Sequence, residues 1–308
     1  MVDKAKRRIV VLGGGVSGER EVSLASSKAV FGAIPSEYDK IWVDLKEEAL
    51  PAALDPEADI IFPVLHGGYG EDGRLQADLE EGGFDYVGCD AKTSRICIQK
   101  SLTKQLVSTM AVPVAKDMIF QYSSPPSWKA LIDHFESPSL VLKPAAEGSS
   151  VGLYAFNSEA SWKALLPKLI EGEWLVEERL PGFDVTVGIL DDAPLGVIGS
   201  HPEGGFYDYE HKYTLGSTRY SVPAELAEDL TNEIRAAALI AFTAAGGRDF
   251  ARVDFMTDGE SFTFLEINTL PGMTETSLLP KSASVFGYNF ASLVSSMLTP
   301  ALKRSKNF

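Results

Sequence analysis

Strand-like runs that alternate with helical segments and glycine turns constrain the fold of this chain most strongly. Residues 9–12 form a continuous apolar run that ends in glycines, which is typical of a strand buried on both faces. Residues 23–34 then show helical spacing, and residues 40–43 and 59–65 form further strand-like runs. This order predicts an α/β fold with a Rossmann-like parallel sheet, whose loops gather at the carboxyl edge where such sheets bind ligands.

The rest of the chain follows a different pattern, in which helices separate strands that include a hairpin. Apolar spacing predicts one helix over about 93–110 and a longer helix that contains Leu226, Ile234 and Ala241. Further strands are predicted at 113–120, 139–144, 151–156, 173–180, 184–190, 252–256 and 262–268. The fold is therefore expected to be α+β overall, and 308 residues at about 150 per domain suggest about two domains.

Charge and composition exclude several classes of protein. The chain has 28 Lys and Arg residues against 43 Asp and Glu residues, a formal net charge of −15, which argues against a general nucleic-acid binder. Cys89 and Cys97 are expected to be unpaired thiols. The apolar run at 9–12 is too short for a signal peptide, and the uncharged stretch 236–247 is too short to cross a membrane. We therefore expect a cytoplasmic protein with no membrane partner.

The first glycine loop, residues 13–18, has the G-x-G-x-x-G spacing of a dinucleotide site between a strand and a helix. Glu19 and Glu21 follow it directly, so two carboxylates occupy the helix N-terminus where a pyrophosphate would bind. Negative charge there opposes a phosphate but suits a ligand ammonium group. Alternatively, both glutamates only complement the helix dipole, and the motif taken alone favours that interpretation.

A hairpin near the C-terminus carries oxygen ligands of the kind that Mg²⁺ prefers, namely Asp254, Glu266 and Asn268. Glu266 and Asn268 are two apart and so share a strand face. Asp254 reaches that face only if the hairpin loop has an odd number of residues. We therefore predict a three-residue loop at 257–259 with Gly259 left-handed. Carboxylates on opposite faces would refute the metal-site hypothesis.

The two faces of this hairpin are expected to differ. Arg252 shares the face of Asp254, whereas the opposite face is expected to be apolar, with Val253, Phe255, Leu265 and Ile267. Buried carboxylates need a partner or a metal, so this pattern argues against the alternative of a merely solvated polar face.

A second glycine-rich loop at 143–152 has small residues that let backbone amides approach phosphate oxygens, and Lys143 adds a charge. It lacks the ending of a P-loop, and a flexible hairpin is the alternative. Lys100 and Lys212 can likewise be ordinary surface lysines, and His66 can either cap a strand end or contact a substrate.

Taken together, these segments resemble the ATP-grasp superfamily and, within it, the D-alanine–D-alanine ligase family. The resemblance runs from residue 11 to about 282 and is carried by residues 14–24, 66–73, 143–152, 206–213, 252–254 and 266–274. Several such segments in the right order are more specific than any single glycine loop.

The resemblance implies a three-domain ATP-grasp fold with an N-terminal Rossmann-like parallel sheet. The implied domains are 1–92, 93–181 and 182–308, the last with a lid loop at about 206–221. The implied reaction is ATP-dependent joining of two D-alanines through a D-alanyl phosphate, for peptidoglycan precursor synthesis. The implied cofactors are ATP and Mg²⁺, with Mn²⁺ as a substitute, and the implied assembly is a homodimer.

The resemblance also implies roles for substrate-binding residues. Glu19 would hold the ammonium group of the first D-alanine, which overturns the helix-dipole interpretation, and would form a hydrogen-bonded set with Ser149 and the lid residue Tyr213. His66 would lie near this substrate. Arg252 and the Gly272 amide would stabilise the oxyanion, and Ser277 with the Leu278 backbone would bind the second carboxylate.

For the nucleotide, the resemblance implies that three lysines contact phosphates, that one strand holds the adenine and that the hairpin holds the metal. The phosphate contacts would be Lys100, Lys143 and Lys212, and the metal ligands Asp254, Glu266 and Asn268. The adenine contacts would be Glu177, Glu178 and Leu180, and Asp184 would bind the ribose.

Two alternatives stay open at this point. Another ATP-grasp ligase would join D-alanine to D-serine or D-lactate, although Tyr213 and Leu278 favour the dipeptide ligases. A non-catalytic dinucleotide-binding protein would rest on the first glycine loop alone, and would leave the hairpin carboxylates and the lid unexplained.

Overall fold

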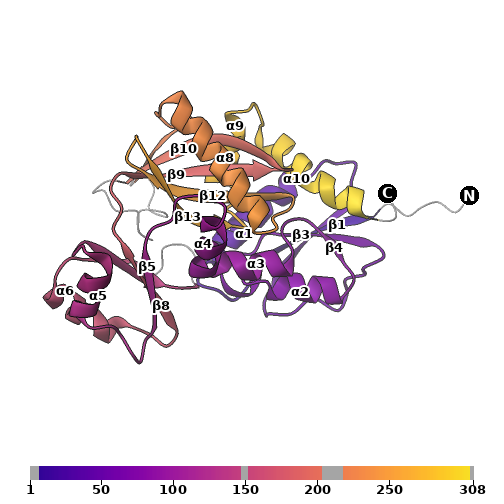
Figure 1. The fold of residues 1–308 in the computed structure, drawn as a ribbon. Helices are drawn as coiled ribbons and strands as arrows, with labels where there is room; N and C mark the ends of the chain where they lie inside the picture. Colours follow the sequence, from indigo (N-terminus) through magenta and orange to yellow (C-terminus); the bar gives the residue numbers. More distant parts are fainter. Residues whose placement is uncertain (1–6, 147–151, 203–217, 306–308) are drawn as a thin grey trace, which may run out of the picture.

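The computed structural model describes residues 7–146, 152–202 and 218–305, which form three β-sheets with helices packed on them (Figure 1). The first sheet lies in the N-terminal third, the second in the middle of the chain and the third in the C-terminal part. The structure confirms the mixed α/β architecture predicted from the sequence.

The N-terminal sheet is parallel throughout, with the strand order β2-β1-β3-β4. Its strands are β1 (Arg8–Gly14), β2 (Lys40–Leu45), β3 (Asp59–Pro63) and β4 (Asp85–Tyr86), and its helices are α1 (Arg20–Ala33) and α2 (Arg74–Glu81). In β1, Val10 pairs with Ile41 on one side and with Ile61 on the other. As predicted, the carboxyl ends of β1 and β3 lead into the two glycine-rich turns.

The prediction of a single helix over about 93–110 is wrong, because the structure has two helices there, α3 (Ala91–Ile98) and α4 (Lys100–Ser108). Gln99 between them is extended, with φ −88° and ψ 92°. The break lets the Lys100 amide donate to the carbonyl of Ala145, 3.2 Å away in another part of the chain. Lys100 therefore becomes the first residue of a new helix.

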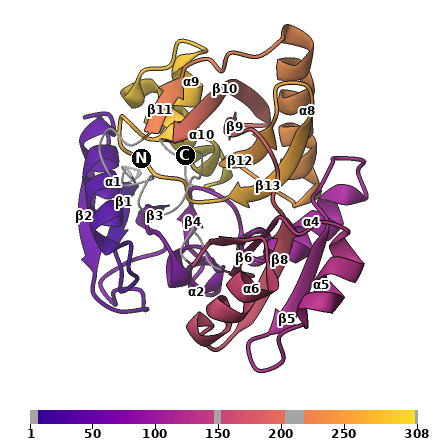
Figure 2. The same ribbon diagram turned by 90° about the vertical axis from the view of Figure 1, so that its left-hand side faces the viewer.

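The middle sheet is antiparallel, with the order β5-β8-β6-β7. Figure 2 shows α5 and α6 lying beside it. Its elements are β5 (Asp117–Gln121), α5 (Trp128–Phe135), β6 (Leu140–Pro144), β7 (Tyr154–Phe156), α6 (Glu159–Leu165), a short 3-10 helix (Leu166–Lys168) and β8 (Glu173–Glu178). Their apolar side chains, among them Leu131, Trp162 and Trp174, form a core of their own.

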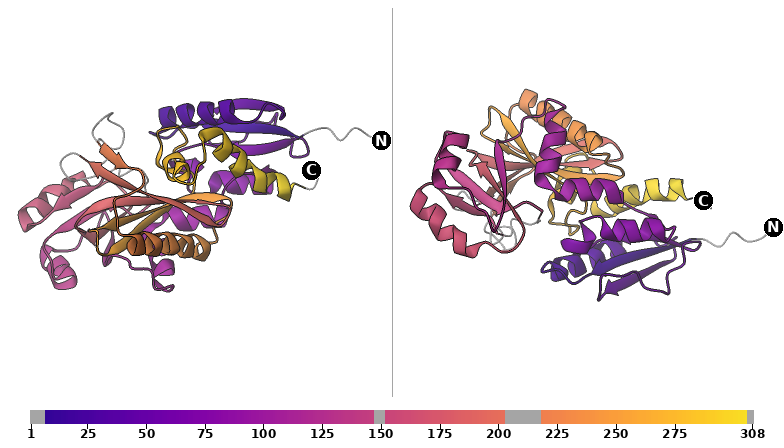
Figure 3. Two further views of the ribbon diagram at one scale, coloured as in Figure 1. Left: turned by 90° about the horizontal axis from the view of Figure 1, so that it is seen from above. Right: turned by 60° about the horizontal axis from the view of Figure 1, so that its bottom comes forward.

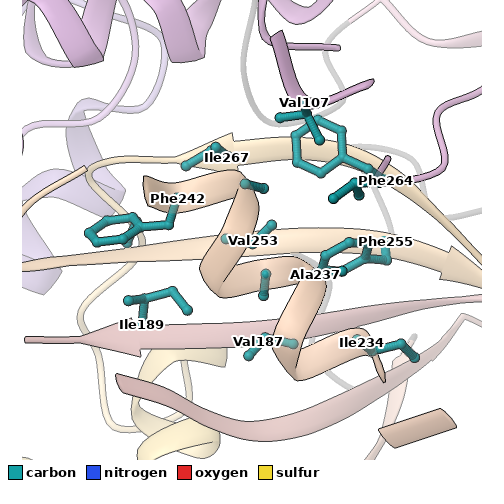
Figure 4. Close-up of a cluster of buried hydrophobic side chains, with 14 of the residues drawn as sticks. Val107, Val187, Ile189, Ile234, Ala237, Phe242, Val253, Phe255, Phe264 and Ile267 are labelled. Atoms are coloured by element: carbon teal, nitrogen blue, oxygen red, sulfur yellow. The ribbon is translucent and has the colours of Figure 1, made fainter. Parts of the chain in front are cut away.

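The C-terminal sheet is antiparallel, with the order β11-β10-β9-β12-β13. It comprises β9 (Phe183–Leu190), β10 (Ala193–Pro202), β11 (Thr218–Ser221), β12 (Phe250–Thr257) and β13 (Phe262–Asn268), with α8 (Glu228–Ala244) and α9 (Leu278–Ser284). α8 covers one face, where Ile234 and Phe242 pack with Val187, Val253 and Phe255 (Figure 4). α9 packs on the opposite face, because the Gly188 amide donates to Ser282 Oγ there.

The hairpin β12–β13 brings Asp254 and Glu266 to one face as predicted, but its loop differs from the predicted one. Asp254 pairs directly with Glu266 and Arg252 with Asn268, so these residues share a face as the metal-site hypothesis requires. The loop is not the predicted three residues, since Thr257 pairs with Phe262 and leaves the four residues 258–261 between them.

A shift in register between Asp254 and Phe255 supplies the odd residue instead. The extra residue is Leu265, because Phe255 pairs with Phe264 while Asp254 pairs with Glu266. The bulge therefore puts Phe264 on the α8 face with Val253 (Figure 4), whereas Leu265, predicted to be there, lines a cavity on the carboxylate face. Gly259 has φ +93°, which confirms its predicted positive φ.

The last helix, α10 (Phe290–Arg304), returns to the N-terminal sheet and packs between it and the C-terminal sheet (Figure 3). Arg304 forms an ion pair with Asp249, whose carboxylate also accepts a 2.8 Å hydrogen bond from the Gly88 amide. Contacts therefore join the last helix to the C-terminal sheet and to the N-terminal third of the chain. The domain boundaries drawn along the sequence stay a prediction. In the described residues, no helix is both long and apolar enough to cross a bilayer.

Candidate active site

A cavity of about 620 Å³ is lined by residues of the middle and C-terminal sheets. Many of the predicted site residues line it, although they are far apart in the sequence. They are Lys100, Lys143, Glu177, Glu178, Leu180, Asp184, Arg252, Asp254, Glu266 and Leu278. The predicted nucleotide and metal residues therefore converge on one space, with the exception of Asn268 and of Lys212, which lies outside the described residues.

One wall of the cavity holds a buried charge network centred on Glu177. Lys104 Nζ donates to Glu177 Oε1 at 2.5 Å, and Lys143 forms an ion pair with the other carboxylate oxygen. Burial alone would raise the pKa of Glu177, but Lys143 and Lys104 together hold it below its usual value. Burial would lower the pKa of Lys143, and Glu177 reverses this so that the pKa is raised. Both groups are therefore charged at neutral pH.

The opposite wall carries the hairpin carboxylates. Arg252 Nε lies 3.0 Å from Asp254 Oδ1, and its Nη2 lies 2.8 Å from Asp254 Oδ2. Thr186 donates to Asp254 Oδ1 at 2.6 Å, and Lys100 Nζ lies 3.2 Å from Glu266 Oε2. Positive and negative groups thus alternate along this wall, which suits a ligand that carries both phosphates and a divalent cation.

The donor chemistry of this wall fits Mg²⁺. Asp254 and Glu266 face one another as a cross-strand pair, and Asn268 follows on the same face with its Oδ1 accepting from the Leu270 amide at 3.1 Å. Within the described ranges, no group of three or more His, Cys, Asp or Glu side chains is arranged to hold a metal ion. Because Mg²⁺ in nucleotide sites takes few protein carboxylates and completes its shell with phosphates and water, two carboxylates with an amide suffice.

Glu19 lies at the N-cap position of α1 and is 9% exposed. Gly67 packs against its carboxylate, since a Cβ atom there would lie 3.1 Å from Glu19 Oε2, and the φ of Gly67 is +70°. The carboxylate therefore lies between the two glycine turns that follow β1 and β3.

His66 has protein partners on both ring nitrogens. Its Nδ1 lies 3.0 Å from the carbonyl oxygen of Leu270, and its Nε2 lies 3.3 Å from Ser26 Oγ. Because a carbonyl oxygen only accepts, Nδ1 carries the proton in this bond. The Met273 amide also donates to Ser26 Oγ at 3.2 Å. His66 thus ties the loop after β13 to the N-terminal sheet.

Gly272 and Ser277 lie side by side in this loop. A Cβ atom at Gly272 would be 3.0 Å from Ser277 Oγ, which also accepts a 3.1 Å hydrogen bond from the Thr274 amide. Ser277 occupies the N-cap position of α9, and the next residue, Leu278, lines the large cavity. The loop therefore runs from His66 to the cavity.

Glu71 connects these two groups of residues. Its Oε1 lies 3.8 Å from His66 Nδ1, and it lines a small cleft together with Lys100, Glu266 and Asn268. The Glu19–His66 region and the charged end of the large cavity are therefore neighbours.

Some predicted site residues lie outside the described residues, namely Ser149, Lys212 and Tyr213. Most of the predicted lid at 206–221 lies there too, but its last residues, 218–221, form β11 and are a strand rather than a loop.

Three residues of the site were not predicted from the sequence. Lys104 follows Lys100 at i+4, a helical spacing that would have placed both on one face, and Glu71 lies within the quoted segment 66–73 without a role. Thr186 left no signal, because its contact with Asp254 depends on the pairing of β9 with β12.

Comparison with known proteins identifies the family of the chain. A family model described as D-ala D-ala ligase C-terminus matches residues 106–299, and one described as D-ala D-ala ligase N-terminus matches residues 44–89. The chain is 38% identical over 299 residues to the D-alanine–D-alanine ligase of Mannheimia succiniciproducens, covering 95% of this chain and 97% of that protein. Identity to the protein of the same name from Thermotoga maritima is 38% over 304 residues, covering 96% and 97%.

Solved structures show the same similarity. The chain matches the VanG D-Ala:D-Ser ligase of Enterococcus faecalis with a TM-score of 0.85 and 28% identity, covering 96% of this chain and 99% of that one. It matches the D-alanine–D-alanine ligase of Bacillus anthracis complexed with ATP with a TM-score of 0.83 and 26% identity, covering 96% and 98%. The chain therefore belongs to the D-alanine–D-alanine ligase family of ATP-grasp enzymes.

Proposed function

We propose that this enzyme joins two D-alanine molecules to D-alanyl-D-alanine at the expense of ATP, for peptidoglycan precursor synthesis. One observation carries the proposal: Lys100, Lys143 and Arg252 meet the carboxylates of Asp254 and Glu266 in one cavity. The cations of this cavity suit the phosphates of a nucleotide, and the buried carboxylate of Glu19 nearby suits the ammonium group of an amino acid.

In the first step, a carboxylate oxygen of the first D-alanine attacks the γ-phosphorus of ATP, and the bond to the bridging oxygen breaks. ADP leaves, and the D-alanine becomes an acyl phosphate. Glu19 holds the ammonium group of this substrate in this proposal, and the nine-tenths burial of its carboxylate between the glycine turns supports this role. Lys100 and Lys143 neutralise the phosphates as negative charge moves onto ADP.

In the second step, the amine of the second D-alanine attacks the acyl carbon, and phosphate leaves after a tetrahedral oxyanion has formed. Arg252 and the Gly272 amide stabilise this oxyanion, while Ser277 and the Leu278 backbone hold the second carboxylate. The proximity of Gly272 to Ser277 supports these roles. The attacking amine must be uncharged, so its proton goes to a base or to water before attack.

The nucleotide lies with its adenine against Glu177, Glu178 and Leu180 and its ribose at Asp184, all of which line the cavity. Asp254, Glu266 and Asn268 hold Mg²⁺, with Mn²⁺ as a substitute, and the ion supplies charge neutralisation for the phosphates when bound. Ser149, Lys212 and Tyr213 complete the site in this proposal, with the lid excluding water that would hydrolyse the acyl phosphate.

Phosphate release tests this function. With ATP, Mg²⁺ and D-alanine alone, we expect phosphate and dipeptide in equal amounts, because each ligation consumes one ATP. Parallel assays supply D-alanine with D-serine or with D-lactate, because the chain also resembles a D-Ala:D-Ser ligase in structure. Turnover only in those mixtures would favour the alternative ligases, and intact ATP in every mixture would favour a non-catalytic nucleotide-binding protein.

We also propose that the enzyme works in the cytoplasm as a homodimer, as the family resemblance implies. Light scattering of the purified chain would then give about twice its 33.3 kDa mass, and a value near 33.3 kDa would contradict the dimer.

A further inference from the structure

Lys104 is a buried lysine that the reaction described above does not use. Its side chain is 2% exposed, and an ammonium group is almost never buried to this extent unless it is paired. Its partners are Glu177 Oε1 at 2.5 Å and Asp117 Oδ2 at 3.1 Å. These ion pairs compensate for the lost hydration of the Lys104 ammonium group, but they do not explain why a charged residue is buried at this position.

The partner Glu177 lies in the wall of the cavity, where both of its oxygens are bound by lysines. Lys104 forms an ion pair with Oε1, and Lys143, which also lines the cavity, forms one with Oε2. Each carboxylate oxygen has two acceptor sites, so each can take one further donor. The two lysines also keep the pKa of Glu177 below its usual value against the effect of burial. Glu177 is thus a fixed, ionised acceptor.

Helix α4 connects this acceptor to the opposite wall. Lys100 and Lys104 are four residues apart and so lie on one face of the helix. Lys100 contacts Glu266 of the C-terminal sheet, while Lys104 contacts Glu177 of the middle sheet. A single helical turn therefore contacts two carboxylates that line the same cavity, one from each sheet.

We infer that Lys104 is a positioning residue for base selection, which holds the Glu177 carboxylate as an acceptor for the exocyclic amine of the purine. This inference rests on the proposed function, which places the base against Glu177. A 6-amino purine donates to that carboxylate, whereas a 6-oxo purine presents a second acceptor and is repelled. Without Lys104, the Glu177 carboxylate either turns toward Lys143 or takes up a proton. In both cases the affinities for the 6-amino and the 6-oxo purine become more alike.

The test compares ADP with inosine diphosphate, which differs at the 6-position of the base. Calorimetric titration of the full chain gives a dissociation constant for each, in the wild type and in Lys104→Met. We expect the dissociation constant for inosine diphosphate divided by that for ADP to fall by about tenfold in the variant. The reason is that the hydrogen bond to the charged carboxylate, which distinguishes the two bases, is lost. KM for D-alanine should not change, and Lys104→Arg should restore most of the ratio.

Asp117→Asn is the matched control, because it removes the other partner of Lys104 and leaves Glu177 in place. It should lower thermal stability without changing the ratio. If Lys104→Met is insoluble, Lys104→Gln removes the charge while keeping a polar side chain, and it should show the same fall.

An unchanged ratio in a soluble Lys104 variant would overturn the inference, because loss of a purely structural residue weakens the binding of both nucleotides alike. An equal fall of the ratio in Asp117→Asn would overturn it too. Phosphate release by the wild type is measured on the same preparation. Wild-type turnover with an unchanged ratio refutes only the role of Lys104, whereas absence of turnover with D-alanine refutes the proposed function.

Discussion

Replacement of Arg252 by alanine is expected to lower kcat by about 10²–10³-fold, the usual loss when one oxyanion donor is removed. The guanidinium group lies in the cavity, where Asp254 orients it through Nε and Nη2. Because the oxyanion exists only during the second step, its loss should reduce kcat far more than the affinity for ATP. Steady-state rates, together with the dissociation constant for ATP, measure this difference.

Arg235→Ala is the matched control for this variant. Arg235 donates to the carbonyl oxygens of Leu195 and Pro194, and it does not line the cavity. Its loss should lower stability and leave kcat almost unchanged. If Arg252→Ala weakened ATP binding as much as it lowered kcat, Arg252 would be a nucleotide-binding or structural residue instead.

Replacement of Asp254 by asparagine is expected to lower activity by about 10²–10³-fold, because the metal contributes several kcal/mol to stabilisation of the transition state. Asparagine keeps the shape and a hydrogen bond to Thr186, but it removes the negative charge that faces Glu266. The concentration of Mg²⁺ needed for half-maximal activity should rise, and electron paramagnetic resonance should show weaker Mn²⁺ binding in the presence of nucleotide.

Asp258→Asn tests whether any aspartate of this hairpin would give the same result. Asp258 lies in the exposed loop, where its Oδ1 accepts from the Ser261 amide at 2.8 Å. Mn²⁺ binding should equal that of the wild type in this variant. Unchanged Mn²⁺ affinity in Asp254→Asn would refute the proposed metal site.

The hairpin shows how far the sequence predicts this fold. Alternation of polar and apolar residues correctly placed Asp254 and Glu266 on one face. The odd-numbered loop that was predicted for this placement is wrong, because a four-residue loop and a bulge at Leu265 bring the two carboxylates to the same face. Sequence patterns fix the parity of a hairpin, but packing against α8 decides which residue is extruded.

The break at Gln99 and the contacts of Lys104 could not be predicted from the spacing of apolar residues, because both depend on contacts with distant parts of the chain. A continuous helix and two short helices share the same apolar spacing, and only the contact of the Lys100 amide with Ala145 separates them. Lys104 was overlooked because its partner Glu177 is far away in the sequence. The roles of Glu19 and Ser277 came from the family resemblance, since neither residue is distinctive by itself.

The charge of the chain also has a different meaning at the site. A net charge of −15 argued against nucleic-acid binding, yet the proposed nucleotide is itself a polyanion. Lys100, Lys143 and Arg252 line one cavity beside the carboxylates of Glu177, Asp254 and Glu266, so cations are available to phosphates locally in an acidic protein. Bulk charge therefore describes the surface, and local geometry describes the site.

Isotope transfer from D-alanine to phosphate tests whether this enzyme activates a carboxylate as an acyl phosphate. The enzyme is supplied with ATP, Mg²⁺ and D-alanine whose two carboxylate oxygens are ¹⁸O, and the released phosphate is analysed by mass spectrometry. We expect one ¹⁸O atom in each phosphate, because the attacking carboxylate oxygen stays on phosphorus when the amine displaces it. Dipeptide formation with unlabelled phosphate would rule out the acyl phosphate.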